Sequence, residues 1–150
     1  MSLGKVAKKK NAEAAPVVLD ATGAAAGRLA AFCAKAALSC AKVDVVNAEK
    51  AEISGDPVKV AQKYANRRHM TQKSNPENAA KWPRRPDYLF KTIVKGMLPK
   101  KKPGGKAALS RVTAHIGVPA QFEGKARKFA TKEQPKGISL DKLCRQLGWM

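Results

Sequence analysis

The chain has 150 residues, which corresponds to one ordinary domain that can bury a hydrophobic core without disulfides or a metal ion. Its 30 Lys and Arg against 11 Asp and Glu give a net charge of +19, which a polyanionic partner would neutralise. No apolar run approaches the roughly 18 residues of a membrane span, and no apolar stretch follows the basic start as in a signal peptide. We therefore expect a soluble, intracellular protein without a membrane partner.

The positive charge is concentrated in the middle of the chain. Residues 16–58 carry 4 basic and 5 acidic side chains, whereas residues 59–111 carry 15 and 2, a net charge of +13. A solvated helix face normally mixes both signs, so this segment indicates a surface for a nucleic acid. Residues 1–15 have a run of lysines but no hydrophobic period, and we predict a disordered basic tail.

The first half of the folded part predicts a β-α-β unit. An apolar run at 16–20 predicts a buried strand that ends in a turn. Residues 27–39 are rich in alanine and other good helix formers and predict a helix, and the β-branched run at 43–47 predicts a second strand. The separation of the two strands leaves room for the helical crossover that parallel strands need.

Two further helices and two basic loops are expected in the middle of the chain. A second helix begins near Pro57, because proline favours the first helical turn. The proline-rich segment 69–86 is predicted to be an RNA-binding loop, since a structureless connection of this length is usually functional. The apolar period of 87–98 predicts a third helix, and the lysine-rich segment 99–106 is predicted to be a second RNA-binding loop.

The remaining sequence predicts three short elements. Residues 107–111 favour a short helix, 112–117 a strand, and 139–147 an amphipathic C-terminal helix. We treat 16–150 as a single α/β domain in which 125–150 is a C-terminal helical extension.

Neither the cysteines nor the histidines predict a metal site. Cys33, Cys40 and Cys144 make an odd count without a C-x-x-C pair, so we expect free thiols. Cys33 and Cys40 lie seven residues apart, which predicts one helix face and a core-filling role. His69 and His115 have no cysteine or acidic neighbour at ligand spacing, so no metal ion is expected.

A glycine-containing turn lies between the first strand and the first helix, where nucleotide-binding folds place a phosphate loop. Three residues rather than four separate Gly23 from Gly27, and Arg28 follows, so the spacing fits neither the P-loop nor the dinucleotide fingerprint. We expect no cofactor, no small-molecule substrate and, without a nucleophile motif, no catalysis. Gly27 is predicted to let the helix approach the sheet closely.

The candidate RNA-binding residues are mainly basic side chains that would pair with phosphates. Trp82, in the long loop, either stacks on an exposed base or packs on its own domain, whereas Phe90 belongs to the apolar stripe of its helix. The predicted RNA-binding residues are Arg28, Lys59, Lys63, Arg67, Arg68, His69, Lys73, Lys81, Trp82, Arg84, Arg85, Lys95, Lys100, Lys101, Lys102, Lys106 and Arg111.

Ordered motifs run from about residue 17 to the end of the chain. They are VLDA at 18–21, GRLA at 27–30, ISG at 53–55, KY at 63–64, VKGMLP at 94–99, GK at 105–106, VTAHIG at 112–117 and LGW at 147–149. Together they resemble the universal large-subunit ribosomal protein thirteen family. The NP pair at 75–76, IGVP at 116–119 and the C-terminal helix are similar to its eukaryotic and archaeal branch, the 13a type.

The resemblance implies a three-layer α/β/α fold on a four-stranded parallel sheet. It also implies that the protein is a structural constituent of the large ribosomal subunit in the cytoplasm. If the source is eukaryotic, the protein would be nucleolar during subunit assembly. Such a protein is embedded in large-subunit ribosomal RNA and contacts neighbouring ribosomal proteins. Two positions depart from the family pattern: His115 stands where Leu or an aromatic is usual, and the turn at 24–26 is less bulky.

Two other functions remain open at this point. A free nucleic-acid-binding regulator would bind many RNAs with a steep salt dependence and would sediment freely. A nucleotide-dependent enzyme on a Rossmann-like fold would bind a labelled nucleotide. A ribosomal protein would instead sediment with the large subunit.

Overall fold

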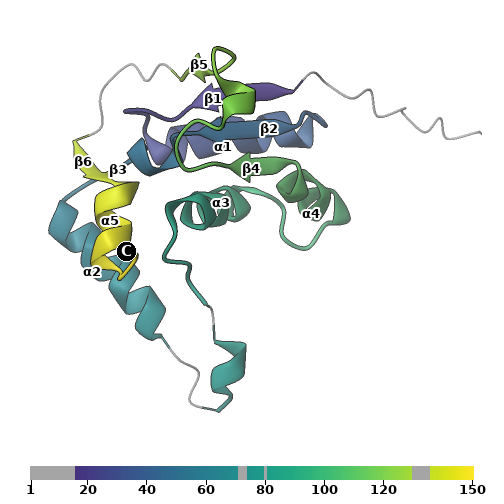
Figure 1. The fold of residues 1–150 in the computed structure, drawn as a ribbon. Helices are drawn as coiled ribbons and strands as arrows, with labels where there is room; N and C mark the ends of the chain where they lie inside the picture. Colours follow the sequence, from purple (N-terminus) through teal and green to yellow (C-terminus); the bar gives the residue numbers. More distant parts are fainter. Residues whose placement is uncertain (1–15, 71–73, 80, 130–135) are drawn as a thin grey trace, which may run out of the picture.

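The structure is a computed structural model that describes residues 16–70, 74–79, 81–129 and 136–150 (Figure 1). The basic tail predicted at 1–15 and the candidate Lys73 lie outside the described residues.

Four parallel strands form the central sheet, in the order β4-β2-β1-β5. A separate antiparallel pair joins β3 to β6. The strands are β1 (Val17–Asp20), β2 (Val43–Val46), β3 (Glu52–Ser54), β4 (Val112–Ala114), β5 (Arg127–Lys128) and β6 (Gly137–Ser139). The predicted strands at 16–20, 43–47 and 112–117 correspond to β1, β2 and β4, and the four-stranded parallel sheet is confirmed.

Helices and short 3₁₀ turns connect the strands. The helices are α1 (Ala26–Leu38), α2 (Pro57–His69), α3 (Pro86–Met97), α4 (Pro103–Ser110) and α5 (Leu140–Gln146). The 3₁₀ turns are η1 (Ala48–Lys50), η2 (Pro76–Asn78) and η3 (Ala120–Phe122).

The hydrophobic core lies between the sheet and the packed helices α1, α3 and α4. Side chains alternate between the two faces of a strand, so Leu19, Val43 and Val45 point to the same side. All three are at most 5% exposed and pack with the inner faces of α1 and α3. On the helices the core side chains recur about once per turn, and on the strands they recur every second residue, so the two apolar faces pack against each other.

The segment that carries η3 crosses the other face of the sheet, in front of the strands in Figure 1, with α1 behind them. On this side Asp44 is 3% exposed, and the His115 Nε2 lies 3.4 Å from its Oδ1. The His115 ring also contacts Phe122 of η3, with 5.3 Å between the ring centroids. The architecture is the expected three-layer α/β/α fold, and His115 makes a polar contact with Asp44 on this face of the sheet.

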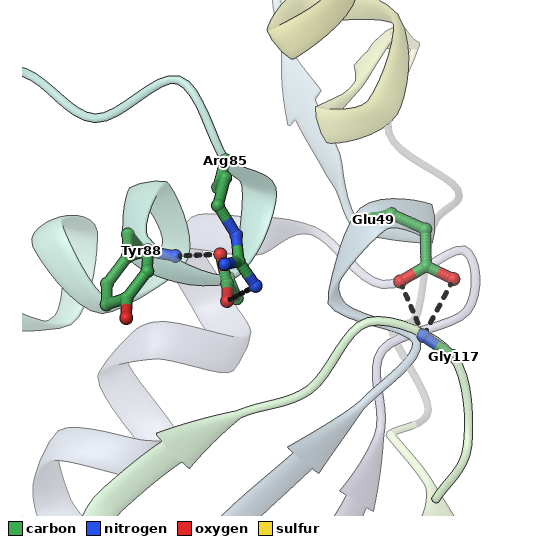
Figure 2. A network of polar contacts seen from close by, with 5 residues as sticks. Glu49, Arg85, Tyr88 and Gly117 are labelled. Carbon is green, nitrogen blue, oxygen red and sulfur yellow. Dashed lines mark hydrogen bonds and ion pairs between the residues drawn. The ribbon is translucent and has the colours of Figure 1, made fainter. Parts of the chain in front are cut away.

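Short polar bonds close the turns where β1 and β2 end. Asp20 Oδ1 accepts from the Thr22 backbone N–H at 3.0 Å and from the Asn47 side-chain amide at 3.0 Å. The Gly117 N–H donates to both carboxylate oxygens of Glu49, at 3.3 and 3.1 Å (Figure 2). These bonds tie the loop after β4 to the end of β2.

The C-terminal segment, predicted at 125–150 as a helical extension of the single domain, contains the helix α5 and also two short strands. It supplies β5, the edge strand beside β1, and β6, which pairs with β3. In α5, Leu140, Leu143 and Cys144 are fully buried in the main core. Sequence pattern predicted α5 but not β5 and β6, because two- and three-residue strands are too short to show a period.

The predicted loop at 99–106 and helix at 107–111 are wrong in their boundaries, because α4 begins at Pro103. Proline has the φ angle of a first helical residue, which outweighs the two glycines that follow. Gly105 is buried, and a Cβ at this position would collide with the Pro99 carbonyl oxygen. Lys106 therefore lies on a helix rather than in a loop.

Two smaller predictions are also wrong. Gly27 does not approach the sheet, because a Cβ built on it meets no atom within 4 Å. Cys40 lies beyond the end of α1 in a left-handed conformation, with φ of 67°, and does not share a helix face with Cys33. Cys33 is the core side chain, at 0% exposure.

None of the described helices combines the length and the apolar character that crossing a bilayer requires.

Candidate nucleic-acid interface

Two adjoining surface hollows lie along the outer side of α3 and α4. The first, of about 310 Å³, is lined by Lys81, Pro83, Tyr88, Lys91, Thr92, Lys95 and Leu109. The second, of about 260 Å³, is lined by Lys95, Leu98, Pro99, Lys100, Gly105, Lys106 and Leu109. Because Lys95 and Leu109 line both hollows, the two form one continuous surface.

We call the five lysines of these hollows the lysine face: Lys81, Lys91, Lys95, Lys100 and Lys106. The amphipathic period of α3 contributes two of them, since Leu89, Phe90 and Val94 are fully buried while Lys91 and Lys95 lie on the outer side. No acidic side chain of the described chain lines either hollow. Like charges gathered in this way repel one another, and an anionic partner would relieve that repulsion.

The start of α4 adds to the positive potential. Lys102 is the N-cap residue, and the first turn contains no acidic side chain. A helix N-terminus carries a partial positive charge that disfavours nearby cations and favours anions. Lys101 and Lys102 are exposed beside the lysine face but do not line the hollows.

A second basic group, which we call the arginine cluster, joins the end of α2 to the segment before α3. It consists of Tyr64, Arg67, Arg68 and Trp82. The Arg67 Cζ lies 4.8 Å from the centroid of the Trp82 ring and 5.4 Å from that of Tyr64. Arg68 Nη1 donates to the Trp82 carbonyl oxygen at 3.0 Å.

Trp82 packs on its own domain in this structure, as in one of the two roles considered for it. Its ring meets Tyr64 edge-on, with centroids 6.0 Å apart, and it packs half-buried against the core. Burial raises the pKa of Tyr64, and the neighbouring Arg67 offsets part of this rise. Arg67 and Trp82 are both partly exposed, and both remain predicted RNA contacts.

Arg84 and Arg85 have contacts within the protein. Arg85 Nη2 lies 2.9 Å from Asp87 Oδ2, and its Cζ lies 5.3 Å from the Tyr88 ring centroid (Figure 2). The Arg84 guanidinium lies against the C-terminal turn, with its Cζ 3.8 Å from the position of a Cβ on Gly148. Contacts within the protein therefore restrict both guanidinium groups.

The other candidates belong to neither of these two groups. Lys59, Lys63 and His69 are exposed on α2. Arg111 follows α4, where its Nη1 donates to the Ala37 carbonyl oxygen at 3.3 Å. Arg28 lines a cavity of about 830 Å³ at the start of α1, together with Lys136.

Sequence reasoning missed Lys91 and Tyr64. Lys91 lies four residues before Lys95 on a predicted helix, and this spacing would have placed both lysines on one face. In the sequence Tyr64 stands out only within the KY motif at 63–64, because its contact with Arg67 and Trp82 depends on how α2 meets the loop.

The described residues contain no group of three or more His, Cys, Asp or Glu that could hold a metal ion. Burial raises the pKa of both Cys33 and Cys144 to about 12, so these thiols are protonated and unreactive at neutral pH.

Comparison with known proteins decides the family. The sequence model described as ribosomal protein L13 matches residues 14–121. The chain belongs to the ribosomal protein L13 family. Proteins of the L13 family are structural and non-enzymatic, which confirms that the chain is not an enzyme.

Similar L13 proteins occur in several archaea. The protein named large ribosomal subunit protein uL13 from Aeropyrum pernix is 40% identical over 149 residues, covering 91% of this chain and 92% of the relative. The protein of the same name from Methanococcus maripaludis is 44% identical over 104 residues, covering 69% and 76%. These relatives agree with the resemblance to the eukaryotic and archaeal branch of the L13 family.

Proposed function

We propose that this protein is a structural constituent of the large ribosomal subunit in the cytoplasm, where it binds and stabilises folded ribosomal RNA. In this role it supports subunit assembly and translation. Its partners are large-subunit ribosomal RNA and neighbouring ribosomal proteins. The large-subunit assignment follows from the names of its archaeal relatives.

The observation that carries RNA binding is the lysine face. The segment before α3, α3 itself, the loop after it and α4 all contribute to it, from Lys81 to Lys106. A surface without acidic side chains complements a phosphate backbone, which attracts Lys and Arg and releases counterions on binding. Contacts of this kind position a protein on RNA without reading bases.

Sedimentation of a cell extract tests the ribosomal role. The tagged full-length chain should co-sediment with the large subunit in a sucrose gradient and should leave those fractions after nuclease treatment. Free sedimentation before nuclease treatment would contradict the proposal and favour a free regulator.

Direct binding tests the RNA contact. In-vitro transcripts that together cover large-subunit ribosomal RNA should include a fragment that binds the purified protein more tightly than small-subunit RNA of equal length. Equal affinity for both RNAs would mean that the protein binds RNA only through non-specific electrostatic attraction, and it would contradict the proposed target.

A further inference from the structure

The cation-π contacts of the arginine cluster set Arg67 apart from the other basic side chains. The guanidinium lies over the ring of Trp82 and beside the ring of Tyr64, at 4.8 and 5.4 Å from the centroids. Within the described part of the chain, no hydrogen bond or ion pair uses its N–H groups. Stacking restricts the plane of the guanidinium but leaves the donors at its edge available.

The neighbouring contacts hold the stacking surface in place. Arg68 bonds to the backbone carbonyl of Trp82, and the Trp82 ring packs against Tyr64. Both rings rest against the core. The surface beneath Arg67 is therefore fixed by the fold before any partner arrives.

We propose that Arg67 is a preorganised fork that grips two adjacent acceptor atoms of the RNA, which makes it a geometric contact rather than a general positive charge. This proposal rests on the proposed RNA-binding function. The shared chemistry of the target is a planar pair of acceptors, either two phosphate oxygens or the O6 and N7 of a guanine. The lysine face contributes point charges on flexible side chains, whereas the arginine cluster contributes hydrogen-bond donors with a fixed orientation.

The substitution Arg67→Lys separates geometry from charge. Lysine keeps the positive charge but loses the planar pair of donors, so affinity for the bound large-subunit RNA fragment should fall about ten-fold. The slope of log affinity against log salt should stay unchanged in Arg67→Lys. If the acceptors are phosphate oxygens, Arg67→Ala should lower that slope by roughly 0.7 to 0.9.

Arg127→Lys is the matched control. Arg127 is exposed on β5, is not among the predicted RNA-binding residues and has no aromatic ring contact among the described residues, so its replacement should change affinity less than about two-fold. Circular dichroism melting of each variant checks that the fold is intact. Parent-level binding by Arg67→Lys, or an equal loss in both lysine variants, would overturn the assignment to Arg67.

A second measurement needs no RNA. The Nε–H of Arg67 should show a high ¹⁵N order parameter in the free protein, whereas that of Arg127 should be mobile. Equal mobility of the two would overturn preorganisation. Failure of the parent to bind any large-subunit fragment would instead overturn the proposed function.

Substitution of 7-deazaguanosine in the transcript distinguishes the two acceptor sources. If Arg67 grips a guanine, loss of N7 should weaken the parent and abolish its advantage over Arg67→Lys. If it grips a phosphate, that advantage should persist with the modified RNA. Either result supports the fork and identifies its target.

Discussion

At the scale of single residues, the two glycines at the starts of helices have opposite surroundings. A Cβ on Gly105 would meet the Pro99 carbonyl oxygen, whereas a Cβ on Gly27 would lie in open space. Gly105→Ala should therefore destabilise the fold by about 1 to 3 kcal/mol. Gly27→Ala should be neutral or stabilise it by up to about 1 kcal/mol, because it restricts the unfolded chain. Urea unfolding of the two variants checks this, and a larger loss from Gly27→Ala would contradict it.

Asp20 provides a residue-scale prediction about pH. Partial burial raises its pKa, but hydrogen bonds from Thr22 and Asn47, together with the charge of Lys128, bring the pKa below the ordinary value of 3.8. The stability that the charged form contributes is fully present above that value and is lost as the pH falls through the lower folded pKa. Asp20→Asn should cost about 1 kcal/mol at neutral pH.

The difference in free energy of unfolding between the parent and Asp20→Asn should shrink as the pH falls below 3.8. Urea unfolding of both proteins above and below this pH measures it. A difference that stays constant would show that the carboxylate charge has no role in the turn.

At the scale of elements, α4 begins beside three lysines with no acidic residue in its first turn. Replacing Lys100, Lys101 and Lys102 with alanine removes repulsion among them and with the helix N-terminus. The free protein should become more stable by a few tenths to about 1 kcal/mol. RNA binding should weaken, with a salt slope lower by about 2 to 3 units.

The control is a triple variant in which Lys42, Lys50 and Lys142 are replaced with alanine. These lysines are exposed and line neither hollow of the lysine face. Filter binding at several salt concentrations should show a smaller change of slope for the control. Equal changes in the two triple variants would mean that total charge, rather than this surface, determines binding.

At the scale of the whole molecule, the C-terminal segment shares one core with the rest of the domain. Leu143 of α5 is fully buried in the cluster that contains Leu29 and Phe90. Leu143→Ala should cost about 2 to 5 kcal/mol, whereas Lys142→Ala on the exposed side should stay within about 0.5 kcal/mol.

Unfolding of Leu143→Ala should remain a single transition that circular dichroism and tryptophan fluorescence report together. A fluorescence transition at lower denaturant than the loss of the helical signal would show that the C-terminal segment unfolds as a separate unit.

Sequence reasoning predicted the long elements well because their periods are local. The segments at 16–20, 27–39, 43–47 and 87–98 correspond closely to β1, α1, β2 and α3. The concentration of charge at 59–111 also contains both the lysine face and the arginines of the arginine cluster. Charge and periodicity are properties of neighbouring residues, so no tertiary information was needed for them.

The sequence by itself determined the α/β class, the basic character and, through its ordered motifs, the L13 family. Only the tertiary structure decided that Trp82 packs inward beneath Arg67 and that α4 starts at Pro103. It also decided that β5 and β6 complete two sheets. The physical reason is that these features depend on contacts between distant segments, where burial and backbone pairing outweigh local preference.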